Sequence, residues 1–460
     1  MDFAPHVARQ RAYFLSGATR STAFRQAQLG RLLAALGARE GALLAALHAD
    51  LGKSPLEAYT TELGMVRGEI SHAVRHLPRW VRPQRRPVPP LTWPARGWVA
   101  PEPFGVTLII GPWNYPLQLL LAPLVAALAA GNCALLKPSE FAPRTAAVVA
   151  DLIGATFPPE YVAVVNGERD TAEALLREQF DRIFFTGSTR VGRAVAAAAA
   201  RHLTPVTLEL GGKCPCLVAA DAPLAVAARR IVWGKFLNAG QTCVAPDYVL
   251  VDRRVAADLL AEMIRAVREF YGPDPRRSPD YSRIIHRAHW DRLAGYLAPG
   301  RVICGGAGVP EELYFPPTIL ADVPPDAPVL HEEIFGPLLP VREFSAWDEA
   351  LAFVRDRPAP LALYLFTPDR ALQRRVLAET RSGGVALNDT VTHMIGAGLP
   401  FGGVGESGQG RYHGQAGFAE FTYPRSVLRR SARWDAGLLF PPPRASFAMV
   451  KRSFRWLLGG

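Results

Sequence analysis

The pattern of apolar and polar residues changes character twice along the chain. Up to about residue 80, apolar positions recur at helical spacing, first over residues 23–48 and again over residues 63–77. From residue 105 onward, short continuous apolar runs alternate with helical stretches. Continuous apolar runs are typical of strands buried on both faces, so the alternation predicts an α/β fold with parallel sheets covered by helices.

The alternation falls into two blocks, which predicts two α/β domains. In the first block, strands are expected at 105–110 and 133–137 and helices at 117–130 and 144–153, and the series continues through 162–166, 172–178 and 182–186. The second block extends from residue 215 to about residue 366, with a helix-like run at 222–237 and a strand-like run at 248–251.

A proline-rich segment separates the N-terminal helices from the first block. Five prolines lie between residues 81 and 100. Proline at that density excludes a helix or a central strand. We therefore expect an extended arm or a crossover there.

Composition places the chain among ordinary globular proteins. Its 460 residues are 49% hydrophobic and 20% charged, enough for two or three domains around a large core. Five cysteines make no disulfide framework, and no second Cys or His pair accompanies Cys214 and Cys216, so we expect reduced packing thiols and no metal. The N-terminus has no signal-peptide core and residues 117–130 are too short to span a bilayer, which predicts a cytoplasmic protein.

The net charge of +11 favours anionic ligands, such as phosphates, carboxylates or acidic lipid surfaces. We find no recognisable nucleic-acid-binding module, so a nucleic acid is not an expected partner.

One cysteine differs from the other four in its setting. Cys243 ends the connection Gly240-Gln241-Thr242-Cys243 between the helix-like run and the next strand. Buried cysteines usually pack as small hydrophobes, whereas a thiol on a loop is more often there for its reactivity. Cys243 is therefore a candidate nucleophile.

Two segments could bind a phosphate-bearing ligand. Gly187 and Ser188 lie between a strand and a helix, where backbone N–H groups can bind an anion, although an ordinary tight turn has the same pattern. Lys137 and Glu140 follow another strand and could hold ribose hydroxyls or form a surface ion pair. Glycines 403, 405 and 408 match the dinucleotide fingerprint, but no clear strand precedes them, so we treat that match as coincidental.

Three further polar positions lie in apolar surroundings. Asn114 is a neutral donor suited to a developing oxyanion, or else part of a capped, packed turn. Glu209 is flanked by two leucines, so desolvation would raise its pKa toward that of a general base unless it faces water at a strand edge. Of Glu332 and Glu333, one could point into the protein, or both could be solvated.

Taken together and in order, these segments resemble the aldehyde dehydrogenase superfamily. The motifs are PWNYP, KPSE, FFTGST, ELGGK, GQTC, EEIFGP and LPFGGVGESGQG, and the resemblance covers the chain to about residue 440. The segment GRYHGQAGFAEFTYPRSVL and the short N-terminus are similar to the class 3 branch, which includes fatty and aromatic aldehyde dehydrogenases.

The resemblance implies a Rossmann-like NAD-binding domain, a catalytic α/β domain and a small β arm that bridges two subunits of a homodimer. The implied ranges are 1–80 and 101–210 for NAD binding, 211–424 for catalysis, 81–100 and 425–445 for the arm, and 446–460 for a tail.

The implied reaction oxidises an aldehyde to a carboxylate with NAD, and NADP is possible. Cys243 matches the nucleophile, whose attack on the carbonyl gives a thiohemiacetal, with the oxyanion between the Asn114 amide and the Cys243 N–H. Hydride transfer to the nicotinamide leaves a thioester, and Glu209 matches the residue that activates water to hydrolyse it. Cys214 departs from the motif, because a polar residue without a thiol is expected there.

The remaining matches define a cofactor groove and a mostly apolar aldehyde pocket. The cofactor-binding matches are Trp113, Lys137, Glu140, Gly187, Ser188, Val191, Leu210, Glu333 and Phe335. The pocket candidates are Tyr115, Leu119, Trp233, Thr242 and Ile395. A carboxylate at Glu140 can accept a hydrogen bond from a ribose 2′-hydroxyl but repels a 2′-phosphate, which predicts a preference for NAD.

Two alternatives compete with this reading. In a CoA-acylating relative, CoA would take the acyl group, and the base Glu209 would be unnecessary. A non-enzymatic structural protein on the same scaffold is the other, although here all the catalytic positions are filled.

The C-terminal tail has the pattern of a short basic amphipathic helix. Its apolar face would contain Phe447, Val450, Phe454, Leu457 and Leu458, with Lys451, Arg452 and Arg455 largely off that face. The pattern is typical of weak contact with an anionic membrane surface. The alternative is that the same face docks on the protein itself or on a dimer partner.

Overall fold

The N-terminal region is helical, as its apolar spacing predicts. The computed structural model describes residues 2–89, 92, 94–434, 440–441 and 445–457. The first helices are α1 (Ala4–Leu15), α2 (Thr22–Ala38), α3 (Glu40–Leu51), α4 (Pro55–Ala58) and α5 (Gly64–Trp80), with a π-helical turn, η1 (Tyr59–Leu63), before α5. The apolar stretch 23–48 is divided between α2 and α3, which meet at a bend of 68°.

The first alternating block forms a mainly parallel sheet with the strand order β15-β7-β6-β3-β4-β5. Its strands are β3 (Val106–Ile110), β4 (Cys133–Lys137), β5 (Val162–Val164), β6 (Arg182–Thr186), β7 (Val206–Glu209) and β15 (Gly408–Gln409). The connecting helices are α6 (Gln118–Ala130), α7 (Pro143–Thr156), α8 (Arg169–Leu175) and α9 (Thr189–Ala200). The edge strand β15 pairs antiparallel with β7 and follows the second block in the sequence.

The second block forms a sheet with the order β10-β11-β12-β9-β8-β13-β14, parallel except for β10 against β11. Its strands are β8 (Pro215–Val218), β9 (Tyr248–Asp252), β10 (Arg301–Cys304), β11 (Thr318–Ala321), β12 (Leu338–Phe344), β13 (Ala362–Phe366) and β14 (Gly384–Leu387). Its helices are α10 (Leu224–Phe236), α11 (Ala256–Tyr271), α12 (Arg287–Ala294), α13 (Trp347–Arg355) and α14 (Arg370–Glu379). The block therefore continues about one strand beyond residue 366.

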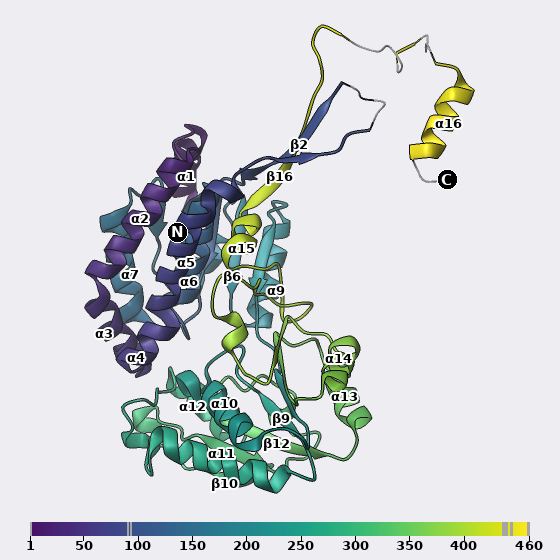
Figure 1. Ribbon diagram of the computed structural model, residues 1–460. Coiled ribbons are helices and arrows are strands. Elements are labelled where there is room, and N and C mark those ends of the chain that lie inside the picture. The colour runs from purple at the N-terminus through teal and green to yellow at the C-terminus, as the bar shows by residue number, and fades with distance from the viewer. Residues whose placement is uncertain (1, 90–91, 93, 435–439, 442–444, 458–460) are drawn as a thin grey trace.

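The proline-rich segment is extended, as predicted, but part of it supplies a central strand, which the proline density had seemed to exclude. The strands β1 (Gln84–Arg86), β2 (Arg96–Pro103) and β16 (Thr422–Arg429) pair in that order and project from the body (Figure 1). Pairing of β1 with β2 stops at Val99, so Pro101 and Pro103 lie where β2 has only β16 as a neighbour. Compared with the ranges 81–100 and 425–445 expected for the arm, β2 continues to Pro103, and β16 begins at Thr422 and ends at Arg429.

The helix α6 lies in the core, as its uniformly apolar sequence predicts. All of its residues except Ala126 are buried, and the chain leaves it at Gly131, whose φ of 96° favours glycine. Cys214 and Cys216 also pack in the core. Among the described residues no single helix is long and apolar enough to cross a membrane, although the bent pair α2 and α3 meets such a test by length and composition.

The tail forms the predicted helix, α16 (Phe447–Leu457), preceded by α15 (Gly414–Glu420) in the body. Figure 1 shows α16 apart from both sheets. Phe447 and Phe454 on its apolar face are exposed. Leu458, the last residue of the face expected from the sequence, lies outside the described residues.

Candidate active site

Loops from the two sheets meet at one cavity of about 250 Å³. It lies beyond the carboxyl ends of β3, β6 and β7, where α/β proteins bind ligands. Its walls are Pro112, Trp113, Asn114, Leu119, Thr186, Gly187, Ser188, Glu209, Leu210, Gly211, Cys243, His289, Arg292, Glu333 and Phe335. The three predicted catalytic residues and most of the predicted cofactor residues therefore share one space.

The backbone before Cys243 is unusual and turns the thiol into the cavity. Asn238, Ala239 and Gly240 have φ values of 52°, 51° and 76°, in the left-handed region. A Cβ at Gly240 would lie 2.2 Å from the carbonyl oxygen of Gly336, so only glycine fits there. Burial, and then the carboxylates of Glu333 and Glu209, raise the pKa of Cys243 to about 12.

Asn114 is held by the loop that carries the thiol. Its side chain is almost completely buried, and Nδ2 donates a hydrogen bond to the Gln241 carbonyl oxygen at 3.0 Å. An amide nitrogen carries two N–H donors, so one remains for a ligand in the cavity. The geometry suits a donor to an oxyanion better than a simple turn cap.

Glu209 is desolvated, as its apolar flanks predict. It ends β7 with 3% of its surface exposed, and neither carboxylate oxygen has a hydrogen-bond partner among the described residues. Burial raises its pKa well above the usual value. Gly408 of β15 pairs opposite Glu209, and the Ser407 carbonyl oxygen accepts the Leu210 N–H at 3.1 Å. The fingerprint-like glycines therefore build the edge beside Glu209 instead of opening a helix.

Of the two adjacent glutamates, Glu333 points into the protein. Burial, and then the nearby Asp247 carboxylate, raise its pKa to about 8. A Cβ on Gly211 would lie 2.0 Å from the Glu333 carboxylate, so the glycine makes room for it. Glu332 instead lies at the surface and accepts a hydrogen bond from the Tyr296 hydroxyl.

The far end of the cavity fits a dinucleotide phosphate. Ser188 is the N-cap of α9, where its hydroxyl accepts the Val191 N–H at 3.4 Å, and N–H groups of a first helical turn favour an anion. At Gly187 an added Cβ would meet the Phe185 ring at 2.5 Å, so the backbone there stays bare. The half-exposed Val191 lies on this turn, outside the cavity wall.

Of the other predicted cofactor residues, one pair lies beyond the cavity wall and another pair lies on it. Lys137 and Glu140 form an ion pair at 2.8 Å just past β4, beyond the cavity wall, with Lys137 buried and Glu140 partly exposed. The Trp113 and Phe335 rings meet edge to face at 5.3 Å on the cavity wall. This bare glycine turn, helix N-terminus and aromatic pair fit NAD(P), and the nicotinamide it carries is a hydride acceptor.

A second, apolar pocket of about 90 Å³ adjoins the first through the loop 114–119. Its lining is Thr60, Thr61, Met65, Tyr115, Gln118, Trp233, Leu237, Val391, Met394 and Ile395. Tyr115, Trp233 and Ile395, three of the residues predicted to line an aldehyde pocket, thus lie together here. Of the other two, Leu119 lines the larger cavity, and the Thr242 hydroxyl lies 2.6 Å from that of Tyr115.

The motifs gave no sign of several residues that line these spaces. His289 and Arg292 belong to α12, where they bind the carbonyl oxygens of Phe335 and of residues 333–334 and so fix the Glu333 loop. The pocket walls from η1 and from residues 391–395 are far from the catalytic motifs in sequence. No group of three or more His, Cys, Asp or Glu among the described residues could hold a metal ion.

The fold and site define a class of enzyme: an NAD(P)-linked oxidoreductase in which a thiol, a carboxamide and a desolvated carboxylate face one cavity. The aldehyde dehydrogenase family model matches residues 3–427. The chain therefore belongs to the aldehyde dehydrogenase family and oxidises an aldehyde with NAD(P), as the motifs indicated.

Relatives place it near family 3. It is 43% identical to the 4,4'-diaponeurosporen-aldehyde dehydrogenase of Staphylococcus aureus, covering 97% of each chain. It is 45% identical to the Mus musculus aldehyde dehydrogenase family 3 member A2, covering 98% of this chain and 95% of the relative. It is 43% identical to the dimeric NADP-preferring enzyme of Canis lupus familiaris, covering 95% and 97%. The solved substrate-bound Staphylococcus aureus AldH superposes with a TM-score of 0.96 at 42% identity, covering 98% and 99%.

Proposed function

We propose that Cys243, Asn114 and Glu209 are the catalytic residues of this aldehyde oxidation. The Cys243 thiolate adds to the aldehyde carbon, and the resulting oxyanion accepts hydrogen bonds from Asn114 Nδ2 and the Cys243 backbone N–H. NAD(P), which residues such as Ser188 and Phe335 would hold, would supply the acceptor for the hydride that the thiohemiacetal carbon loses, and Cys243 would then carry a thioester. Glu209 then removes a proton from water, the water attacks the thioester, and the carboxylate and the thiol are released.

One observation carries this proposal: the three groups line the same cavity whose other end is a bare glycine turn at a helix N-terminus. Cys243→Ser should abolish dehydrogenase activity and leave NAD binding intact, because a serine hydroxyl without a base is a weak nucleophile. NADH absorbance measures the first and quenching of tryptophan fluorescence the second. Turnover near that of the wild type would refute the assignment.

Hydrolysis, and not acyl transfer to CoA, fits the site. A CoA-acylating enzyme has no need of a water-activating base, whereas Glu209 is buried at the cavity and its carboxylate has no hydrogen-bond partner among the described residues. Added CoA should therefore leave steady-state turnover of the wild type unchanged.

The pocket favours apolar aldehydes, and we propose medium-chain or long-chain aliphatic and aromatic aldehydes as substrates. Its lining is mostly hydrophobic. Trp233 and Ile395 belong to this lining, and their side chains are partly exposed to solvent. A panel of aliphatic aldehydes of increasing length, together with aromatic aldehydes, should show KM falling as apolar length grows. A KM that does not depend on length would contradict the assignment.

NAD is the proposed preferred cofactor. The Glu140 carboxylate repels a 2′-phosphate, although its pairing with Lys137 weakens that repulsion. The specificity constant should be higher with NAD than with NADP, and Glu140→Gln should narrow the difference. A wild-type preference for NADP would refute this proposal.

Three properties of the whole protein complete the proposal. We propose a homodimer formed through the β arm, whose outer strands β1 and β16 are largely exposed edges. We propose a cytoplasmic location, since all five cysteines are free; a tagged chain should fractionate with the cytoplasm.

The third property is weak contact with anionic membranes through the C-terminal tail. Residues 446–460 contain three Lys and Arg and no acidic residue. Basic charge of this density attracts an anionic surface.

A further inference from the structure

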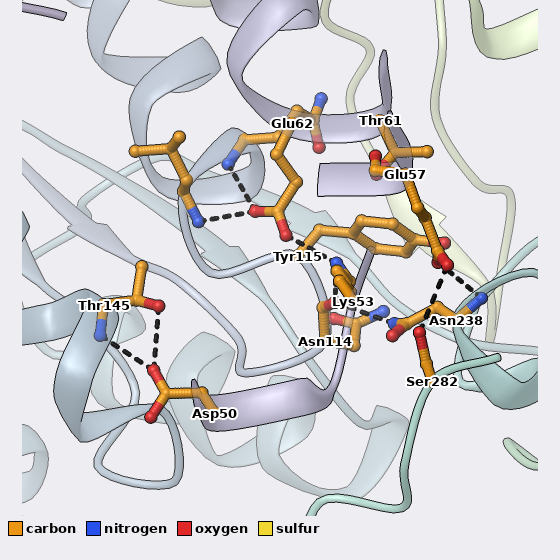
Figure 2. A network of polar contacts seen from close by, with 12 residues as sticks. Asp50, Lys53, Glu57, Thr61, Glu62, Asn114, Tyr115, Thr145, Asn238 and Ser282 are labelled. Atoms are coloured by element: carbon orange, nitrogen blue, oxygen red, sulfur yellow. Dashed lines mark hydrogen bonds and ion pairs between the residues drawn. The ribbon is translucent and has the colours of Figure 1, made fainter. Parts of the chain in front are cut away.

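A fully buried lysine lies beneath the loop that carries Asn114. Lys53 follows α3, and its ammonium donates to the Glu62 carboxylate and to the Asn114 main-chain oxygen at 2.9 Å (Figure 2). It also lies 4.0 Å from the centroid of the Tyr115 ring. An ammonium buried without partners would be very costly, so its contacts with Glu62 and this loop fix where it can lie.

Glu62 holds the other end of the same loop. Its second carboxylate oxygen accepts the backbone N–H groups of Leu117 at 2.8 Å and Gln118 at 3.2 Å, where α6 begins. A carboxylate at a helix N-terminus also interacts favourably with the helix dipole. The Lys53–Glu62 pair therefore fixes the loop both at Asn114 and at its entry into α6.

A second carboxylate ties this loop to the thiol-bearing loop. Glu57 accepts the Asn238 backbone N–H at 2.7 Å and the Ser282 hydroxyl at 3.2 Å (Figure 2). The Asn238 side chain in turn donates to the Asn114 oxygen at 2.8 Å and to the Gln241 oxygen at 3.2 Å. The Asn114 carbonyl thus has two donors, one from each side.

Only one of the two carboxylates belongs to the π-helical turn η1. Glu57 lies in α4 and Glu62 lies in η1, which follows α4 directly in the chain. Short π-helical segments are found frequently at functional sites. Thr60 and Thr61 of the same turn line the aldehyde pocket.

We propose that Lys53, paired with Glu62, is a positioning residue that holds the Asn114 amide where the oxyanion develops. With the Asn114 main chain fixed from below, one side-chain N–H rests on the Gln241 oxygen and the other stays directed to the cavity. Transition-state stabilisation by a fixed donor is lost when the donor moves by a fraction of an ångström. The inference rests on the role proposed above for Asn114, through which Lys53 acts without touching substrate.

A double-mutant cycle tests the inference. Lys53→Met removes the ammonium at similar length and should lower kcat by about tenfold or more, with the NAD dissociation constant unchanged. In an Asn114→Ala background, the same substitution should lower kcat by less than about twofold, because the group it positions is gone. Single-turnover NADH formation gives the rate of oxidation in the slow variants.

Two further variants protect the test from effects on folding. Lys53→Met leaves the Glu62 carboxylate unpaired, so Lys53→Met/Glu62→Gln removes both charges and keeps an acceptor for the N–H groups of Leu117 and Gln118. It should show the same loss of kcat. Leu36→Ala, in the buried face of α2, is the matched control: it should lower the melting temperature and leave kcat within about twofold of wild type.

The outcomes separate this inference from the proposed function. An equal loss of kcat from Lys53→Met with and without Asn114 would overturn the positioning role and leave the role of Asn114 intact. Wild-type kcat in the Lys53→Met/Glu62→Gln variant would overturn it as well. Full activity of Asn114→Ala alone would instead refute the proposed role of Asn114.

Discussion

At the scale of single residues, burial controls the ionisable groups around Cys243. Desolvation raises the pKa of Glu209 and Glu333 as well as that of the thiol, so the carboxyls favour their neutral forms. The charged forms of Glu333 and Glu209 each raise the pKa of Cys243 further. The thiolate therefore forms most readily while these two carboxyls are protonated, whereas the proposed role of Glu209 in hydrolysis would need it deprotonated. The two half-reactions place opposite demands on one carboxyl.

The first prediction concerns Glu209. Glu209→Gln should form about one equivalent of NADH in a burst and then stall, because acylation proceeds without a general base for water. In the wild type, the steady-state rate should rise as pH rises through the elevated pKa of Glu209, and the variant should lack that rise. Stopped-flow NADH absorbance over a pH series measures both. A variant with no burst would move Glu209 to a step before hydride transfer.

The second prediction concerns Glu333 and the pH dependence of stability. Its pKa is about 8 in the fold and near 4.5 when unfolded, so between these values the folded state holds a proton that the unfolded state has lost. Its contribution to the free energy of unfolding is therefore full below pH 4.5 and falls as pH rises toward 8. Glu333→Gln should remove that decline. Urea titrations at pH 5 and pH 8 measure it, and an unchanged difference between the two pH values would contradict the assignment.

At the scale of elements, short irregular segments position the chemistry. The left-handed residues 238–240 come just before the thiol that lines the cavity, and β15 closes the sheet edge beside Glu209. The turn η1 carries Glu62, whose carboxylate accepts the N–H groups of Leu117 and Gln118. The helix α16 differs from these, since it stands apart with exposed aromatic side chains and basic neighbours.

The third prediction concerns α16. The full-length protein should associate weakly with anionic vesicles at low salt, and truncation after Pro443 should abolish this, because one short amphipathic helix binds lipid only marginally. Vesicle flotation at low and high salt measures the association, with neutral vesicles as the control. Phe447→Ser/Phe454→Ser keeps the charge and should also weaken it. If full-length and truncated chains both remain unbound, the helix docks on protein instead.

At the scale of the whole molecule, the arm is the part that the body supports least. The strands β1, β2 and β16 project from the two sheets (Figure 1). The residues of β1 and most of those of β16 are exposed, and most of those of β2 are half-buried. Isolated small sheets are marginally stable in water, and free strand edges tend to pair. A second subunit would supply both the pairing and the apolar contact that the arm lacks.

The fourth prediction concerns that assembly. Light scattering should give about twice the 50.0 kDa mass of one chain. Leu428→Asp places a charge on an exposed apolar position of β16 and should shift the equilibrium to monomer. Leu15→Asp, on an exposed end of α1 outside the arm, is the control and should stay dimeric. A monomeric wild type at micromolar concentration would exclude the dimer.

Hydrophobic periodicity located the local elements. The residue types at the ends of these elements and in the connections between them then gave the chemical candidates. The strands 133–137 and 182–186 have the predicted bounds. Ser188 lies at the start of a helix, Glu209 at the end of a strand and Cys243 in the connection before the next strand, as the sequence indicated. Local patterns can do this because periodicity and glycine placement report the geometry and burial of a few neighbouring residues. The family motifs then indicated the reaction, because they contain the residue types that the reaction of that family uses.

The tertiary structure alone decided which distant residues meet. Nothing in the spacing of residues 403–409 shows that β15 pairs beside Glu209, and no local pattern shows that Lys53, between α3 and α4, donates a hydrogen bond to the Asn114 main-chain oxygen. The same holds for Thr60, Thr61 and Met394, which line the apolar pocket beside Tyr115, and for Leu119, which lines the larger cavity. These contacts depend on how helices pack on sheets across long separations in sequence, and a local pattern carries no information about that packing.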